Sequence, residues 1–328
     1  MKNVFLSVII PIYNTAEYLP LCLSRISKQD WDDYEIICID DCSTDDSLSI
    51  ARSFEQDAPN LFSVYANEHN LGQGRSRERG IRLAKGRYVT FIDSDDYVSR
   101  NYLSTYCEAA QRSNADVVVG GFTRDADGRL AKNPAPNYPW CLATYSVACA
   151  KLFKTSFLRE HSIRFSKERR GEDIFFNLLC YCHGATVEVL PHFGYHYRLN
   201  RTSTTKTISH NMHFEESIVS MFEELNRYIP FSSLSDNQRN VVCYSYVANV
   251  INALITYSHG CYPKDMMERY TRVFSAGNQL FPGFLDNPLF RFFGAPGQTS
   301  KIRYSIWLVM LLHRLNLDKP LFAFISLV

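Results

Sequence analysis

The stretch RYVTFIDSDDYV, residues 87–98, decides the fold. Its first half is rich in β-branched and aromatic residues, and the apolar side chains of Val89, Phe91 and Ile92 indicate a buried strand. The strand ends in three aspartates: Asp93, Asp95 and Asp96. Carboxylates packed this closely repel one another, so the pattern predicts a positively charged partner at the end of the strand.

Four more short apolar runs lie in the first 120 residues: FLSVIIPI, YEIICIDD, LFSVYAN and ADVVVGG. Stretches with helical spacing separate the runs, over residues 16–29, 44–55, 73–85 and 100–113. The alternation predicts an α/β fold with a mostly parallel sheet flanked by helices. Ligands bind at the carboxyl ends of strands in such sheets. Three runs end there in polar residues, and we expect these to converge on one edge: Tyr13-Asn14, Asp40-Asp41 and Asp93–Asp96.

The composition is that of a folded globular protein. The chain has 328 residues, 46% hydrophobic and 21% charged, and a net charge of +1. This balance gives no general case for binding nucleic acid. The ten cysteines contain no CxxC pair and several lie in apolar runs, which predicts buried free thiols. The N-terminal run is interpreted as a strand and not as a signal peptide, and a cytoplasmic protein is expected.

The character of the chain changes twice after these runs. Residues 125–139 are polar and interrupted by prolines, which predicts a surface loop. From about Ser209 strand alternation gives way to helical spacing, as in VVCYSYVANVINALITY. We therefore expect an α/β domain over residues 1–208 and a helical extension over residues 209–328.

Asp93-Ser94-Asp95 is interpreted as half of a divalent-metal site. Mg²⁺ and Mn²⁺ take oxygen ligands, commonly one or two carboxylates and the phosphate oxygens of a substrate. The alternative is an Asp-rich turn that caps the next helix. The position of the motif at the end of a hydrophobic strand, in register with Asp40-Asp41, favours the metal.

Arg77 is the second candidate residue. On the helix predicted over residues 73–85 it shares a face with Gly80, Ile81 and Ala84, which should pack on the sheet. A guanidinium there needs a partner, because an unpaired buried charge is costly. Near the first turn of a helix that partner is expected to be a phosphate, unless the side chain extends its charged end into water.

Two further segments carry candidate residues. In RRGEDIFF, Glu172 and Asp173 open a helix, where carboxylates either cap the helix or serve as a general base in a cleft. In GYHYRLNRTSTT, Arg198 and Arg201 lie in a Ser/Thr-rich stretch typical of an anion-binding loop, or of an ordinary surface loop. A dinucleotide-binding enzyme is disfavoured, because PIYNTAEY after the first run lacks the Gly-x-Gly-x-x-Gly turn.

Seven ordered segments then resemble a known family. They are SVIIPIYN, IICIDDCSTDDS, NEHNLGQGRSRERG, GRYVTFIDSDDYV, KLFKTSFLREHSIRFS, RRGEDIFF and YHYRLNRTST. In order and spacing they resemble the family 2 glycosyltransferases with the GT-A fold, of the type found in bacterial polysaccharide biosynthesis, over residues 4–205. The resemblance implies an inverting, metal-dependent transfer of a sugar from a nucleotide diphosphate donor to an acceptor hydroxyl. It also implies that residues 1–208 form the catalytic domain.

The resemblance also implies roles for single residues. Asp173, supported by Glu172, would deprotonate the acceptor. Asp95, with Asp93, would hold Mn²⁺ or Mg²⁺. The nucleotide-sugar residues it implies are Pro11, Tyr13 and Asp41 at the base, Arg77 at the diphosphate, Asp93 at the ribose or sugar, and Arg198 and Ser203 in a loop that closes over the diphosphate. Asn14 and Ser94 are also implied as nucleotide-sugar residues.

Two departures from the family pattern bear on sugar or acceptor preference. Ser76-Arg77-Glu78 stands where members commonly have Ala-Arg-Asn, and Ala148-Cys149-Ala150 stands where many have a tryptophan. Uridine is the expected base, with guanosine and thymidine left open. Two other functions remain as alternatives: a nucleotidyltransferase, and an inert module that binds a sugar nucleotide or a glycan.

The expected partners are the nucleotide-sugar donor and an acceptor that is a glycan or a lipid-linked saccharide; an oligomer is compatible with the sequence. In the tail, Ile306–Leu312 is apolar, and Lys301, Arg303, Arg314 and Lys319 flank it. The apolar run is too short to span a bilayer. Two interpretations are equally weighted: a helix packed on the rest of the protein, and peripheral contact of residues 300–328 with the inner face of the plasma membrane.

Overall fold

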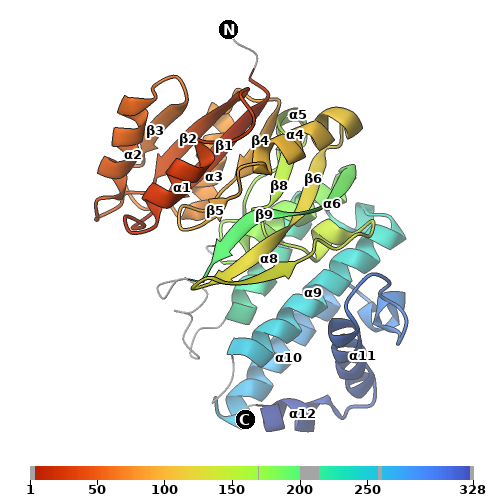
Figure 1. Ribbon diagram of the computed structural model, residues 1–328. Coiled ribbons are helices and arrows are strands. Elements are labelled where there is room, and N and C mark those ends of the chain that lie inside the picture. The colour runs from red at the N-terminus through yellow and green to blue at the C-terminus, as the bar shows by residue number, and fades with distance from the viewer. Residues whose placement is uncertain (1–3, 169, 200–213, 258–260, 326–328) are drawn as a thin grey trace. The chain divides into compact units, whose positions relative to one another are not determined.

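The computed structural model describes residues 4–168, 170–199, 214–257 and 261–325 (Figure 1). The chain forms two compact units. The first consists of residues 1–135, 145–165 and 183–201. The second consists of residues 136–144, 166–182 and 202–328. Each unit is therefore assembled from segments that are separated in the sequence.

The first unit is built on a nine-stranded sheet of order β3-β2-β1-β4-β8-β6-β9-β5, with β7 paired to β6 (Figure 1). The strands are β1 (Leu6–Ile12), β2 (Tyr34–Asp40), β3 (Phe62–Ala66), β4 (Tyr88–Phe91), β5 (Tyr97–Val98), β6 (Val117–Ala126), β7 (Arg129–Asn133), β8 (Lys151–Lys154) and β9 (Val187–Arg198). β1 to β4 pair in parallel, whereas β8 is antiparallel to both β4 and β6. The α/β class is confirmed, and the sheet as a whole is mixed.

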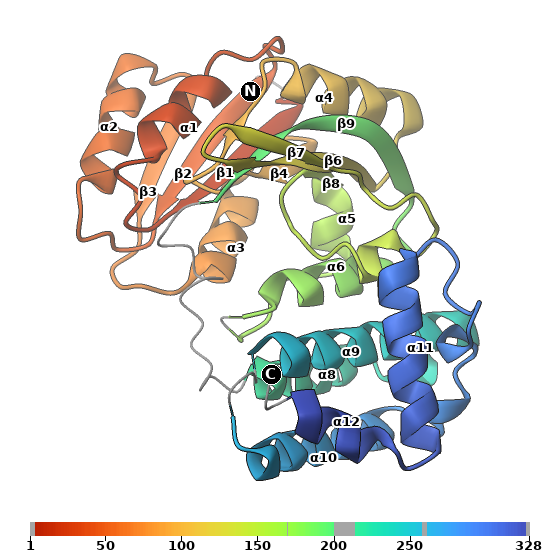
Figure 2. The ribbon, with the colours of Figure 1, turned by 60° about the horizontal axis from the view of Figure 1, so that its bottom comes forward.

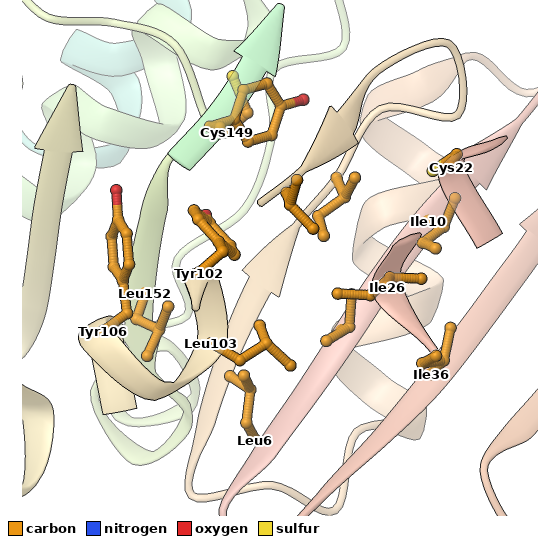
Figure 3. Packing of buried hydrophobic residues seen from close by; sticks show 14 of the residues in the cluster. Leu6, Ile10, Cys22, Ile26, Ile36, Tyr102, Leu103, Tyr106, Cys149 and Leu152 are labelled. Carbon is orange, nitrogen blue, oxygen red and sulfur yellow. The ribbon is translucent and has the colours of Figure 1, made fainter. Parts of the chain in front are cut away.

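Alternating side chains of β1 explain how helices cover both faces of the sheet. Ile10 joins a core with Cys22 and Ile26 of α1 (Leu19–Ile26) (Figure 3). Ile9 points to the other face, where α3 (Gln73–Leu83) packs so closely that a Cβ at Gly80 would lie 2.4 Å from Ile9 Cγ2. Two other helices add residues to the first core: α2 (Ser47–Asp57) and α4 (Tyr102–Ser113).

The predicted loop over residues 125–139 is wrong for its first half. β6 continues to Ala126, and a two-residue turn at Asp127 and Gly128 leads into β7. Both turn residues have positive φ, 52° and 85°, as Asp-Gly hairpin turns require. β7 pairs only with β6 and is largely exposed, so it needs no apolar pattern, and the sequence signal for a strand is missing.

The second unit is helical, as the spacing predicts (Figure 2). Its helices are α6 (Glu172–Cys182), α8 (Phe214–Tyr228), α9 (Asp236–Tyr257), α10 (Pro263–Leu280), α11 (Ser300–Arg314) and α12 (Asp318–Ile325). Tyr246 of α9 is central to its core and contacts the rings of Phe222 and Phe281. A short helix, α5 (Thr155–Glu160), belongs instead to the first unit.

Two other sequence expectations concern the whole chain. All ten cysteines are free thiols and eight are buried, which confirms the expectation from their apolar surroundings. Over the described ranges, no helix combines the length and the apolar character needed to cross a membrane.

Candidate functional site

Three neighbouring strands of the first unit end at one edge of the sheet. β1 lies between β2 and β4, and the backbone bonds continue past the strand ends: Asp41 N–H donates to Ile12 O at 2.8 Å, and Ile92 N–H to Ile9 O at 3.1 Å. The polar residues that follow the strands, Tyr13, Asp41 and Asp93, are thereby brought to a common edge. This confirms the predicted convergence.

Asp41 is buried and accepts three hydrogen bonds from the segment that leads into α3. Its Oδ1 accepts from Asn67 Nδ2 at 2.7 Å and from Leu71 N at 2.9 Å, and its Oδ2 accepts from Gly72 N at 2.7 Å. Gly72 has a φ of 91°, which favours glycine. The carboxylate thus fixes the loop after β3 against the end of β2.

Tyr13 is 48% exposed and immediately follows β1. Pro11, two residues earlier, is buried within the strand. Asn14 has a φ of 50° and ties the turn to the loop after β2: its Oδ1 accepts from Thr44 N at 2.8 Å, and its N–H donates to Ser43 Oγ at 3.1 Å. An exposed aromatic face on a rigid turn is suited to stacking on a base.

Arg77 of α3 provides the positive charge that the crowded aspartates require. Its Nη2 donates to Asp93 Oδ1 at 2.7 Å, and Gln73 Nε2 donates to the same oxygen at 2.9 Å. The Arg77 side chain is 1% exposed, and its guanidinium lies over the rings of Phe91 and Phe165, 5.8 and 5.5 Å from their centres. The predicted packing against the sheet is confirmed. The guanidinium is paired with Asp93, and its expected contact with a phosphate stays a prediction.

The three aspartates after β4 differ in environment. Asp93 and Asp95 are half-buried, whereas Asp96 is 1% exposed. Asp96 Oδ2 accepts from the Tyr195 hydroxyl at 2.6 Å, and Oδ1 accepts from Arg198 N at 2.8 Å. Burial raises the pKa of Asp96, and the nearby Asp93 and Asp95 carboxylates raise it further. Only two of the three carboxylates are therefore placed to meet a ligand.

Asp93 and Asp95 fit a metal that is shared with a substrate. Among the described residues, no group of three or more His, Cys, Asp or Glu side chains could hold a metal ion. Mg²⁺ and Mn²⁺ bound to nucleotides commonly use one or two carboxylates with phosphate oxygens, and this is the donor set that the turn offers.

Ser94 and Arg198 border the same turn. Ser94 is buried and its Oγ accepts from Thr15 Oγ1 at 3.0 Å. Arg198 ends β9, and its guanidinium lies 5.1 Å from the ring centre of Tyr18 and 5.4 Å from that of Tyr97. The predicted site residue Ser203, like Arg201, lies outside the described residues.

Glu172 and Asp173 belong to the second unit, where they form the first turn of α6. Gly171 precedes them with a φ of 75°, a conformation that lets the chain turn sharply into the helix. Asn177 Nδ2 donates to the backbone oxygen of Asp173 at 2.8 Å. Acidic side chains in the first turn of a helix stabilise it through the helix dipole.

Sequence reasoning missed three residues that shape the site. Asn67 bridges Asp41 and Ser76 Oγ, Gln73 donates to Asp93, and Tyr195 donates to Asp96. Asn67 and Gln73 lie within the NEHNLGQGRSRERG segment, which carries part of the family resemblance. The sequence alone assigned no role to either residue. Tyr195 gives no local signal, because its partner lies 99 residues away.

Comparison with solved structures places the fold. Staphylococcus aureus TarS, residues 1–349, solved in complex with UDP-GlcNAc, superposes with a TM-score of 0.72 at 19% identity, over 98% of this chain and 90% of that one. A mannosyltransferase from Pyrobaculum calidifontis, solved with GDP-Man and Mn²⁺, gives a TM-score of 0.56 at 14% identity, over 98% and 85%. These likenesses show the GT-A fold.

Sequence relatives agree with the fold. A poly(ribitol-phosphate) β-glucosyltransferase of Bacillus spizizenii is 28% identical over 215 residues, 62% of this chain and 34% of the relative. Glycosyltransferase GlyG of Streptococcus pneumoniae is 32% identical over 189 residues, 51% of this chain and 62% of the relative. The match therefore spans between about one third and two thirds of these relatives. Residues 7–187, more than half of the chain, match the family described as Glycosyl transferase family 2, and the chain belongs to that family.

Proposed function

We propose that this protein is an inverting glycosyltransferase that moves a sugar from a UDP-sugar to a hydroxyl on a growing glycan or lipid-linked saccharide. The observation that carries the proposal is the sheet edge of the first unit. There an exposed aromatic ring and buried Asp41 lie beside a turn with two accessible carboxylates, in a chain of this family. Relatives named as poly(ribitol-phosphate) glycosyltransferases support a polymeric acceptor, and the TarS structure solved with UDP-GlcNAc supports a UDP-sugar as the donor.

The base is bound at the ends of β1 and β2 in this proposal. Tyr13 stacks on it, with Pro11 and Asn14 holding the turn that carries the ring. Asp41 is already oriented by three backbone and side-chain donors, and its Oδ2, which accepts one of these bonds, would also accept from a base N–H. A pyrimidine with a ring N–H, such as uracil, suits this acceptor.

The diphosphate belongs at the Asp93–Asp95 turn. Asp95 would ligate Mn²⁺ or Mg²⁺, and Asp93 would assist from a carboxylate that Arg77 and Gln73 hold in place. A divalent cation there would neutralise the charge that builds up on the departing diphosphate. Arg77 holds Asp93 in place and contributes its positive charge on the diphosphate side. Arg198, Ser94 and Ser203 complete the proposed diphosphate side.

Asp173 is the proposed general base, with Glu172 in support. The acceptor O–H proton passes to the Asp173 carboxylate while the acceptor oxygen forms a bond to the anomeric carbon. The bond from that carbon to the diphosphate oxygen breaks on the opposite side, so the configuration is inverted. A carboxylate in the first turn of a helix can serve as a general base when the acceptor hydroxyl lies within hydrogen-bond reach.

Donor binding provides the direct test. Nucleotide sugars should be screened by thermal shift with and without Mn²⁺, and hits should be followed by donor hydrolysis. A ligand at about 100 times its dissociation constant stabilises the fold by ~2.7 kcal/mol, so we expect a clear rise in melting temperature for a UDP-sugar with Mn²⁺. Stabilisation by UTP together with release of pyrophosphate would indicate a nucleotidyltransferase. Binding without hydrolysis or transfer would indicate an inert module.

The second unit carries a surface that supports the proposed membrane contact. Half of the large apolar side chains exposed over the described residues fall between residues 292 and 317: Phe292, Phe293, Ile302, Leu308, Leu315 and Leu317. The segment from Asn287 to Leu317 contains four basic residues and no Asp or Glu. The aromatic rings also contact one another, with Phe292 4.9 Å from Trp307. Exposed apolar groups among basic ones complement an anionic lipid surface.

We expect the protein to co-sediment with phosphatidylglycerol vesicles and not with phosphatidylcholine vesicles. A basic residue near an anionic surface is worth ~1 kcal/mol, so Lys301→Ser should weaken binding about fivefold. Phe293→Ser should weaken it further, because that ring is 75% exposed. Tyr262→Ser is the matched control, since Tyr262 is 79% exposed outside the surface. Equal binding by all three variants, or self-association that the first two abolish, would reject the membrane contact.

A further inference from the structure

The peptide groups of Asp93 are held by side chains from elsewhere in the first unit. The Asp93 N–H donates to the Tyr195 hydroxyl oxygen at 3.2 Å. The Asp93 carbonyl accepts from Asp96 N–H at 3.0 Å and from Cys22 Sγ at 3.7 Å. Two of these three bonds reach far along the chain, so the turn is not shaped by its own sequence alone.

Tyr195 and Asp96 form one buried unit behind this turn. The Tyr195 hydroxyl accepts from Asp93 and donates to Asp96, whose other oxygen accepts from Arg198 N–H. Tyr195 is fully buried, and its ring lies 6.2 Å from that of Tyr102 in an edge-on contact. Because both side chains are buried, neither is placed to touch the nucleotide-sugar donor.

A carboxylate in such a place is costly to bury, and a phenylalanine would fill the space of Tyr195 without needing a partner. Hydrogen bonds are directional and apolar contacts are not. A buried polar network in which every group has a hydrogen-bond partner therefore selects one backbone geometry. The bonds of Tyr195 and Asp96 converge on Asp93 and on Arg198, which are two of the residues assigned to the proposed diphosphate side.

We infer that Tyr195 and Asp96 are positioning residues that fix the backbone of the Asp93–Asp95 turn and thereby aim Asp95. The inference rests on the metal role proposed for Asp95. It separates the third aspartate from the two before it: Asp96 supports the ligands and is not one of them. The nucleoside side is held by a different set of bonds, around Asp41, and does not depend on this pair.

Calorimetry on three full-length variants tests the inference. Tyr195→Phe removes the hydroxyl, and Asp96→Asn leaves a single oxygen, which cannot accept from both the Tyr195 hydroxyl and Arg198 N–H. Each should weaken Mn²⁺ binding in the presence of UDP about tenfold, the size expected when one net hydrogen bond no longer supports the turn. The double variant should be no weaker than the worse single one, because the two residues act as a unit. Uridine binding without metal should stay unchanged.

Tyr88→Phe is the matched control. Tyr88 is also fully buried, and its hydroxyl donates to Ala115 O at 3.0 Å, away from the turn. The three single variants, Tyr195→Phe, Asp96→Asn and Tyr88→Phe, should each lose some stability. Tyr88→Phe should nevertheless keep the Mn²⁺ affinity of the wild type. If Tyr195→Phe and Asp96→Asn also keep it, the pair is ordinary core and the inference is rejected. If the wild type itself binds UDP without any Mn²⁺ dependence, the metal proposal fails, and this inference with it.

Discussion

Asp173→Asn is expected to lower transfer to the acceptor by ~10²–10⁴, because this is the usual contribution of a general base. The amide has the shape of the carboxylate but cannot take the acceptor proton. Donor affinity should hardly change, since no base or diphosphate contact is assigned to this side chain. Steady-state transfer and UDP-sugar binding should be measured on the same preparation, so that the two effects are separated.

Glu172→Gln is the comparison for Asp173→Asn, and its transfer should fall less, because Glu172 is assigned a supporting role. Both residues lie in the first turn of α6. The interaction of each carboxylate with the helix dipole contributes about 0.3–1 kcal/mol to stability. Both variants should therefore fold, with melting temperatures close to each other. Near-normal transfer by Asp173→Asn would return Asp173 to the role of a helix cap. A loss in Glu172→Gln equal to that in Asp173→Asn would mean that the turn matters as a structure and not as a base.

Asp95→Asn is expected to abolish Mn²⁺-dependent donor binding and to reduce turnover by about 10²–10³ or more. A bound cation stabilises developing negative charge by several kcal/mol, and the amide oxygen is a much weaker ligand than a carboxylate. Mn²⁺ binding in the presence of UDP should be followed by electron paramagnetic resonance, and donor hydrolysis should be measured in parallel.

Asp46→Asn controls for the loss of one negative charge. Asp46 is exposed at the start of α2, and its side chain makes no capping hydrogen bond. The Asp46→Asn variant should bind Mn²⁺ and UDP as the wild type does. A variant at Asp95 that also retains both affinities would show that the turn is not the metal site.

The sequence predicts the elements of the first unit well where their buried faces are marked by apolar side chains. β1 to β4 and the helices between them follow from runs of apolar residues and from 3.6-residue spacing, and their observed bounds lie within about three residues of the predicted ones. β7 is missed because an exposed edge strand needs no apolar side chains. A local sequence pattern indicates whether a segment is buried, but it does not indicate which other segment packs against it.

The same limit explains what was missed at the candidate site. Periodicity placed Arg77 on the buried face of α3, which is where it lies, but its hydrogen bond to Asp93 on another element is not visible in the local pattern. The bond from Tyr195 to Asp96 joins residues 99 positions apart, so no window of sequence contains it. The membership of residues 136–144 and 166–182 in the helical unit is equally non-local.

The distribution of thiols gives the protein a natural attachment point for a probe. Cys42 directly follows Asp41, has a φ of 63° and is the exposed cysteine of the ten, whereas eight others are buried. Burial also raises the pKa of Cys182 and Cys243 to about 12, so these thiols are rarely in the reactive thiolate form. A maleimide fluorophore should therefore couple first at Cys42, beside the proposed uridine site. Arrival of a nucleotide could then be followed in real time by fluorescence, without introducing a single substitution.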